Sequence, residues 1–374
     1  MLTVILVIIF VLAVLIMVHE LGHFMAAKIM GVKIEKVSLG FGRKLLSKTV
    51  GDTEYRISLV PLGGYVKMAG ERLDEEKPAQ KWEFFGQAVW RRAVILLAGP
   101  FMNFVLAWVI FSSILYLGAP VVKAVIGEVK PGEPAAAAGL NAGDKVLSVD
   151  NEPVGNWGEM ASVIFHNPGR RLNLKVERGG EIIKLAVTPR VSEELNPLNE
   201  KVTKGFIGVS PDPSQLYYFK ETLPQALLKG TRQTITITRM IYAGIWKMAT
   251  GQISPRHLGG PILIAQLTAQ QVKFGFGPLM TFLALISVNL AVINLLPIPI
   301  LDGGHLLFLV AEKIKRRPVS LKTQEIAQSI GLFVLIGIML LATYNDIQRT
   351  RLQRAVEKRE KSILNGRKSA DIPD

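Results

Sequence analysis

Four apolar runs dominate the pattern of hydrophobic and polar positions, at about 2 to 27, 93 to 118, 277 to 297 and 328 to 344. Each is close to the roughly 20 residues that an α-helix needs to cross a bilayer. The first run does not resemble a cleavable signal peptide, because it has no basic residues ahead of it and no small-residue cleavage site. The pattern predicts a polytopic α-helical membrane protein with four transmembrane helices.

Basic residues between the first two runs predict which side of the membrane each segment occupies. They are Lys28, Lys33, Lys36, Arg43, Lys44, Lys48, Arg56, Lys67, Arg91 and Arg92. Since cytoplasmic loops carry an excess of Lys and Arg, this loop is expected in the cytoplasm and both termini outside. A second basic cluster, in the C-terminal tail, disagrees: Arg349, Arg351, Arg354, Lys358, Arg359 and Lys361. Either the last run is re-entrant, or the basic residues of the earlier loops determine the orientation despite the basic tail. We favour the second interpretation.

These assignments divide the chain into nine segments. We expect transmembrane helices at 1–30, 92–118, 276–304 and 327–345, cytoplasmic segments at 31–91 and 305–326, an extracytoplasmic α/β module at 119–212, an extracytoplasmic amphipathic helical segment at 213–275, and a basic tail at 346–374. In the first loop, the β-prone stretches Tyr55–Val60 and Gly63–Met68 flank Pro61-Leu62, which predicts a membrane-associated hairpin. Its role is either packing beneath the helices or offering an edge to which an extended substrate adds as a strand.

Composition narrows the chemistry. The chain has no cysteine, so any zinc ion must be held by His, Asp or Glu. The net charge of the chain is +14, and its basic residues cluster beside the apolar runs. Membrane orientation and contact with anionic lipid explain basic residues at these positions. We therefore expect membrane lipid as a partner and no nucleic acid.

The first apolar run carries the strongest chemical motif, His19-Glu20-x-x-His23. Positions i and i+4 share one face of a helix, so both histidines can bind one zinc ion while Glu20 stands beside it as a general base. Ionisable side chains at membrane depth are costly and need a role or a partner. The motif therefore predicts a hydrolase centre within a transmembrane helix.

Asp302 is the candidate third ligand. Counted at roughly 1.5 Å per residue, His19 lies about 25 Å along the first span, and Asp302 reaches a similar level on the antiparallel third span. Prolines and glycines around Asp302 predict a broken helix, which membranes tolerate only next to protein or a wet cavity. A helix cap or a turn is the alternative role of Asp302. Asn294 either bridges helices or contacts the substrate or the developing oxyanion, and His305 is left outside the ligand set.

Five stretches together resemble the site-2 protease family of intramembrane zinc metalloproteases, most closely its bacterial RseP type. They are His19 to His23, Gly99 to Asn103, Leu258 to Ile262, Phe282 to Leu290 and Asn294 to Gly303. The resemblance implies Zn²⁺ held by His19, His23 and Asp302, Glu20 as catalytic base and Asn294 as a substrate-positioning residue.

The resemblance also implies a fold for the external module and a class of substrate for the protein. The module is similar to a circularly permuted PDZ domain, with Gly205, Phe206, Ile207 and Gly208 matching its carboxylate-binding loop. Substrates would be single-pass inner-membrane proteins, such as a pre-cleaved anti-sigma factor or remnant signal peptides. The enterobacterial members have two tandem PDZ domains, whereas this chain has room for one, and we expect it to act as a monomer.

Two other functions stay open at this stage. One is a membrane zincin whose active site lies on the soluble side, with Glu83 as third ligand. The other is a PDZ-bearing scaffold with a vestigial metal site, although intact His19, Glu20, His23 and Asp302 argue against it.

Overall fold

The computed structural model describes residues 2–71, 79–195 and 200–370. The chain forms two compact units. The first comprises Met1–Phe111, Gly230–Tyr242 and Ser254–Asp374, and the second comprises Ser112–Lys229 and Ala243–Ile253. Each unit is described separately below.

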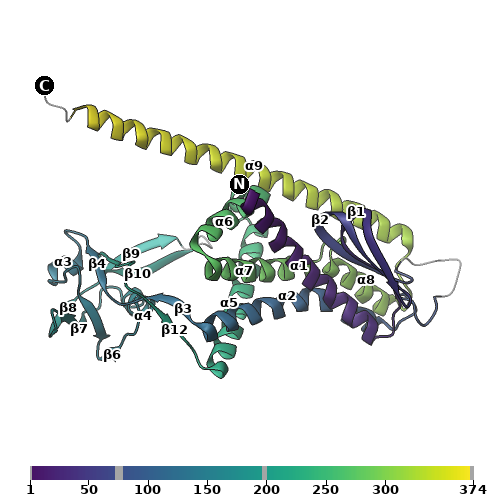
Figure 1. Ribbon diagram of the computed structural model, residues 1–374, viewed down its shortest axis with the longest axis horizontal. Helices are drawn as coiled ribbons and strands as arrows, with labels where there is room; N and C mark the ends of the chain where they lie inside the picture. The colour runs from purple at the N-terminus through teal and green to yellow at the C-terminus, as the bar shows by residue number, and fades with distance from the viewer. Residues whose placement is uncertain (1, 72–78, 196–199, 371–374) are drawn as a thin grey trace. The chain divides into compact units, whose positions relative to one another are not determined.

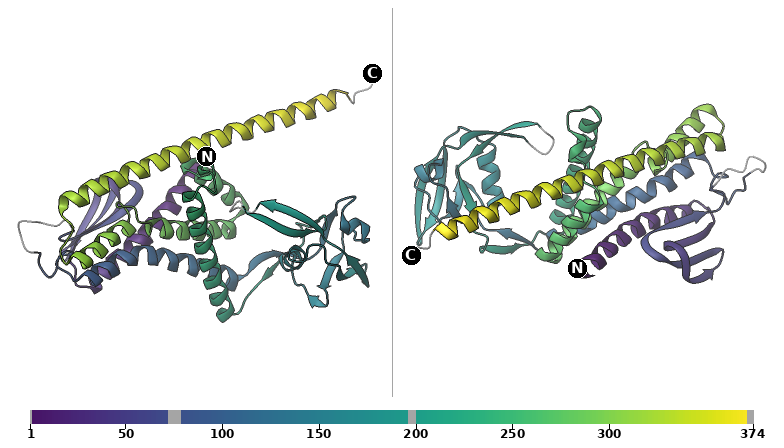
Figure 2. Two further views of the ribbon diagram at one scale, coloured as in Figure 1. Left: turned by 180° about the vertical axis from the view of Figure 1, so that it is seen from behind. Right: turned by 90° about the horizontal axis from the view of Figure 1, so that it is seen from above.

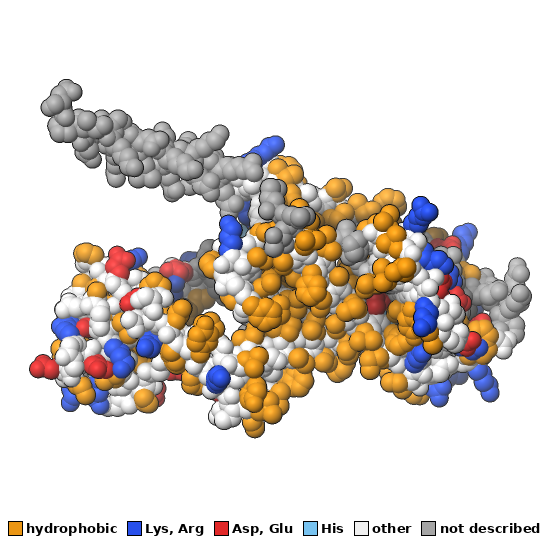
Figure 3. All heavy atoms as spheres, in the orientation of Figure 1, with side chains coloured by type: hydrophobic (Ala, Val, Ile, Leu, Met, Phe, Trp, Pro, Cys, Tyr) orange, Lys and Arg blue, Asp and Glu red, His pale blue; other side chains and the backbone are white. Residues whose placement is uncertain are grey.

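Long apolar helices make up most of the first unit. Within the described residues, four helices are long and apolar enough to cross a membrane: α1 (Leu2–Ile29), α2 (Val89–Leu117), α7 (Phe276–Asn294) and α9 (Leu321–Ala370). They coincide with the four predicted runs. Hydrophobic side chains cover much of the surface over these helices, as expected for a surface that faces lipid tails (Figure 3).

Two helix boundaries differ from the predicted ones. The predicted break in the segment 276–304 is present, but it comes earlier than the predicted end of the span: α7 ends at Asn294, and α8 (Asp302–Lys315) starts a new helix beyond Pro297 and Pro299. The last span is not confined to 327–345. Helix α9 continues to Ala370, since no Pro or Gly interrupts the chain between Gly337 and Gly366. It is the long helix that turns from green to yellow in Figures 1 and 2.

A curved antiparallel hairpin, β1 (Ile34–Val50) and β2 (Thr53–Met68), lies beside α1 (Figure 1). The chain turns at residues 51–52 and reverses direction again between residues 57 and 64, where a turn at Pro61-Leu62 was predicted, but the two stretches that flank this turn do not pair with each other. Residues 36–39 pair on one side with 54–57 and on the other with 64–67. The hairpin is thus folded into a small sheet in which 64–67 forms an edge. Local turn signals missed this arrangement because the central pairing partner lies far back in the chain.

Buried side chains from α1, the sheet, α2 and α8 form one core, which includes Ala27, Ile34, Val66, Ile95 and Leu309. A second cluster joins Val11 and Leu15 of α1 to Leu283 of α7. These two clusters fix the helices that carry the predicted metal ligands.

An ion pair ties α2 to α8 within this unit. Arg92, with 3% of its side chain exposed, binds Glu312, with 12% exposed, through both guanidinium arms. Because Glu312 lies on the helix that begins at Asp302, this pair holds α8 against α2.

The second unit is built around a four-stranded antiparallel sheet in the order β6-β5-β7-β8. Its strands are β5 (Lys145–Val149), β6 (Glu152–Pro153), β7 (Leu172–Arg178) and β8 (Glu181–Val187). Three strand pairs accompany it: β3 (Ala119–Val122) with β12 (Leu216–Phe219), β4 (Ile126–Val129) with β11 (Val209–Pro211), and β9 (Arg190–Leu195) with β10 (Lys201–Phe206). Met160 and Ile164 of α4 (Trp157–Phe165) complete a core with Leu172 and Val176.

The remaining helices are short or amphipathic. They are α3 (Pro134–Ala137), α5 (Leu223–Ala249), the 3-10 turn η1 (Pro255–His257) and α6 (Pro261–Phe274). The N-terminus of α6 is held from α9, where the buried Asp346 accepts hydrogen bonds from the N–H groups of Gly260 and Leu263. A carboxylate at this position satisfies N–H groups that have no partner within α6.

Candidate metal centre

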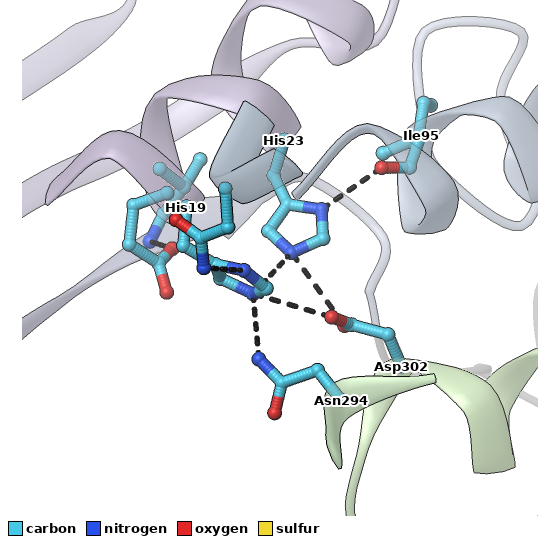
Figure 4. A network of polar contacts seen from close by, with 8 residues as sticks. His19, His23, Ile95, Asn294 and Asp302 are labelled. Carbon is cyan, nitrogen blue, oxygen red and sulfur yellow. Dashed lines mark hydrogen bonds and ion pairs between the residues drawn. The ribbon is translucent and has the colours of Figure 1, made fainter. Parts of the chain in front are cut away.

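Three side chains from distant parts of the sequence converge in the first unit (Figure 4). His19 and His23 lie one turn apart on α1, with their Nε2 atoms 3.1 Å from each other. The Asp302 carboxylate reaches both rings, with Oδ2 3.2 Å from His19 Nε2 and Oδ1 3.5 Å from His23 Nε2. Within the described part of the chain, these residues are the one group of His, Asp and Glu with metal-binding spacing.

The break between α7 and α8 delivers Asp302 to this point. Two prolines stop α7 from continuing, and Asp302 becomes the first residue of α8. Two positions later, a Cβ atom on Gly304 would lie 2.2 Å from the carbonyl oxygen of Ile298. Only glycine allows the start of α8 to pack this closely on the preceding loop, which aims Asp302 at α1.

The distances fit a single zinc ion. Ligands about 2.0–2.1 Å from a tetrahedral zinc are separated from one another by ~3.3 Å, close to the 3.1 to 3.5 Å measured here. Oδ2 of Asp302 is buried and has no hydrogen-bond partner among the described residues, so a cation is the natural partner for it. Two imidazoles and one carboxylate also leave a fourth position open, as catalytic zinc sites do.

Helix α2 supports the imidazoles from behind. The Nδ1 atom of His23 lies 2.8 Å from the carbonyl oxygen of Ile95, which leaves Nε2 of that ring free to bind a metal. Gly99 brings α2 against both rings, because a Cβ atom there would lie 2.3 Å from His23 Nε2. On the other side, the Asn294 amide nitrogen lies 3.4 Å from His19 Nε2, within reach of the metal-binding face.

Glu20 stands between the predicted metal ligands and the sheet. Its Oε2 accepts a hydrogen bond of 2.9 Å from the N–H of Val66, on the edge segment of β2. It lines two cavities. A polar one of about 340 Å³ also contains the His19, His23 and Asp302 side chains, and an apolar one of about 600 Å³ lies between α1 and the sheet.

The other predicted residues are placed as follows. His305 lines the polar cavity without joining the ligand cluster. Glu83, the alternative ligand, instead accepts a hydrogen bond of 2.8 Å from the N–H of Gln80. The sequence assigned no function to Ile95 or Val66, since their contacts with His23 and Glu20 cross 72 and 46 residues and leave no local signal.

Gly205 to Gly208 lie in the second unit. They line a groove of about 200 Å³ next to Trp157, Met160 and Ile164 of α4.

A cluster of two histidines and one carboxylate beside a glutamate, built on apolar helices, defines a metal-dependent hydrolase of the membrane. Comparison with known sequences specifies the class further. The chain belongs to peptidase family M50, whose model matches residues 7–338. It is a zinc metalloprotease, as its similarity to named members of the family also shows.

Two relatives illustrate this similarity. A predicted zinc metalloprotease of Agrobacterium fabrum is 33% identical over 356 residues, which cover 91% of this chain and 94% of that protein. The regulator of sigma-E protease RseP of Salmonella typhimurium is also 33% identical, over 440 aligned positions that cover 90% of this chain and 97% of the relative. The alignment is longer than the 374 residues of this chain, so the Salmonella protein contains residues that are missing here.

Among solved structures, the PDZ domain of the SdrC-like protein from Listeria innocua matches part of this chain. It is 19% identical, covers 24% of this chain and 92% of its own, and has a TM-score of 0.19.

Proposed function

We propose that this protein is an intramembrane endopeptidase that hydrolyses peptide bonds in single-pass membrane proteins. The observation that carries the proposal is the placement of the cluster. His19, Glu20 and His23 lie inside a 26-residue apolar helix, and Asp302 directly follows the break after another apolar helix. A hydrolytic centre at this position is within reach of bonds in a membrane-embedded substrate.

Each residue has a role in the proposed reaction. His19, His23 and Asp302 would hold the zinc ion, which when bound would supply an acidified water molecule and polarise the scissile carbonyl. Glu20 would accept a proton from the attacking water and pass it to the leaving amine. Asn294, whose amide nitrogen lies 3.4 Å from His19 Nε2, donates a hydrogen bond to the substrate backbone or the developing oxyanion.

The two cavities suggest separate routes for the two reactants. The apolar cavity between α1 and the sheet suits an unwound apolar peptide, and the polar cavity suits water. The N–H of Val66 points away from its strand partner towards Glu20. An extended substrate added along residues 64–67 would therefore run directly past the catalytic base.

We further propose the topology and partners that the sequence suggests. The protein lies in a bacterial inner membrane, with the second unit and both termini outside and the loop of residues 31–91 in the cytoplasm. Residues 119–212 of the second unit form a single PDZ domain that screens substrates through the groove at Gly205 to Gly208. A pre-cleaved anti-sigma factor is the expected substrate, since the Salmonella relative is named for sigma-E regulation.

Replacing the catalytic base tests the proposal. Purified Glu20→Gln protein should retain zinc while its cleavage of a fluorescent transmembrane peptide falls by roughly 10²–10⁴-fold, the usual contribution of a general base. Glu83→Gln is the matched control and should cleave normally. Cleavage at the wild-type rate by the Glu20 variant would rule out the mechanism. Wild-type protein that contains zinc but cuts soluble peptides alone would favour a soluble-side zincin instead.

A further inference from the structure

We propose that Asn103 of α2 is a positioning residue for the metal centre, because its amide oxygen accepts the Nδ1–H of His19 and thereby holds that ring ready to bind zinc through Nε2. The inference rests on the proposed role of His19 as a ligand. It assigns a function to a buried amide that the reaction itself does not use.

The first observation is the isolation of this amide. Asn103 is fully buried, and its Nδ2 atom lies 3.4 Å from His19 Nδ1. Its Oδ1 atom has no hydrogen-bond partner among the described residues. An unsatisfied polar atom of this kind inside an apolar bundle costs about 1–3 kcal/mol, so it needs a partner.

The second observation is the chemistry of His19. A neutral imidazole carries one N–H, and a ring that binds metal through Nε2 must carry it on Nδ1. That N–H faces the Asn103 amide, where a nitrogen would place two donors against each other. Rotating the amide by 180° about its last side-chain bond presents the oxygen instead, which gives the Nδ1–H an acceptor and gives Oδ1 a partner.

His23 shows the same arrangement with a different acceptor. Its Nδ1 atom lies 2.8 Å from the backbone carbonyl of Ile95, two turns earlier on α2. One helix thus supports both zinc-binding rings, one through a backbone oxygen and one through a side chain. Substituting Asn103 removes the acceptor of His19 and leaves that of His23 in place, because the acceptor of His23 is a backbone oxygen.

The position of Asn103 is itself fixed by a third helix. The hydroxyl of Ser287 on α7, also fully buried, donates a hydrogen bond of 2.8 Å to the backbone carbonyl of Asn103. This contact holds the α2 backbone at residue 103 but does not involve the amide. Ser287 is therefore the matched control, since its loss should affect packing and not the ring of His19.

Zinc affinity of the purified full-length protein, measured by competition with a chromophoric chelator, tests the proposal. Asn103→Leu removes the acceptor at similar volume and should weaken zinc binding by about 10–100-fold, as loss of a supporting hydrogen bond does in other zinc sites. Asn103→Asp restores an acceptor and should bind zinc at least as tightly as wild type. Ser287→Ala should keep the wild-type affinity while its melting temperature in chelator falls.

A packing role predicts the opposite order for the first two variants, because an unpaired buried carboxylate is worse than leucine. Zinc affinity that is lower in Asn103→Asp than in Asn103→Leu, or unchanged in Asn103→Leu, overturns the inference. If Asn103→Leu fails to fold, Asn103→Asp decides alone: its melting temperature must rise on adding zinc by at least as much as that of wild type. Wild-type protein that binds no zinc would instead refute the proposed function.

Discussion

Gly99 is the position at which one added carbon atom tests the metal centre most directly. It lies on α2 against both imidazole rings, and a Cβ atom built there would be 2.3 Å from Nε2 of His23 and 2.8 Å from Cε1 of His19. Gly99→Ala therefore places a methyl group in the space that the ligand atoms occupy. We expect the variant to fold and to lose most of its zinc binding and activity.

The magnitude follows from the contact distances. Moving the methyl group from 2.3 Å to an ordinary contact of 3.4 Å requires α2 or the ring of His23 to shift by about 1.1 Å. Overpacking of this kind costs about 1–3 kcal/mol of stability. A shift of about 1 Å at a reacting centre costs roughly 10²-fold in rate. The free energy of unfolding should thus fall modestly and kcat steeply.

The assay compares Gly99→Ala with Gly337→Ala, a glycine on α9 where an added Cβ atom would meet no neighbouring atom within 4 Å. The control should be as stable as wild type or up to about 1 kcal/mol more stable, since alanine favours helix. Zinc stoichiometry, melting temperature and cleavage rate are measured on both proteins. Wild-type zinc content and rate in Gly99→Ala would show that α2 does not support the ligands as described.

Three further perturbations test other parts of the structure. Asp302→Ala should abolish stoichiometric zinc binding in elemental analysis while Glu83→Ala retains it, and the reverse result would move the third ligand to the loop. Arg92→Leu should destabilise the protein by about 3–5 kcal/mol in chemical unfolding, because it leaves Glu312 buried and unpaired, and a combined replacement of both residues should recover much of that loss. In the second unit, burial alone would raise the pKa of Asp144, but hydrogen bonds from the Arg178 side chain and the backbone N–H of Asn141 hold this pKa below its usual value. Its stabilising effect should be complete above the unfolded carboxyl value of about 3.9 and be lost as pH falls through the lower folded value. The protection factors of the β5 amides against hydrogen exchange, which correct for the intrinsic pH dependence of exchange, should therefore fall in acid for wild type and change less for Asp144→Asn.

The cluster of His19, His23 and Asp302 was predictable because its spacing is local or tied to membrane depth. The two histidines are one helical turn apart, and Asp302 follows a run whose length brings it to the same level. The prolines beside Asp302 also predicted the end of α7. In these cases the number of residues between two positions predicts their distance along a helix, so the sequence alone is enough.

The sheet and the supporting contacts were not predictable in the same way. The chain reverses near Pro61-Leu62 as expected, but the stretches on either side of this turn do not pair with each other, because residues 36–39 lie between them and pair with both. The contact between Asn103 and His19 spans 84 residues and depends on how two helices pack. Such contacts arise from tertiary packing, for which a single sequence offers no local pattern.

The separation of the ligands along the chain has a consequence for biogenesis. His19 and His23 are synthesised with α1, whereas Asp302 follows only after α7 has been made. A nascent chain that ends before this point holds two of the three proposed ligands and lacks the carboxylate. We therefore expect a chain whose synthesis stops before the break after α7 to be inert towards the other membrane proteins that are being inserted around it.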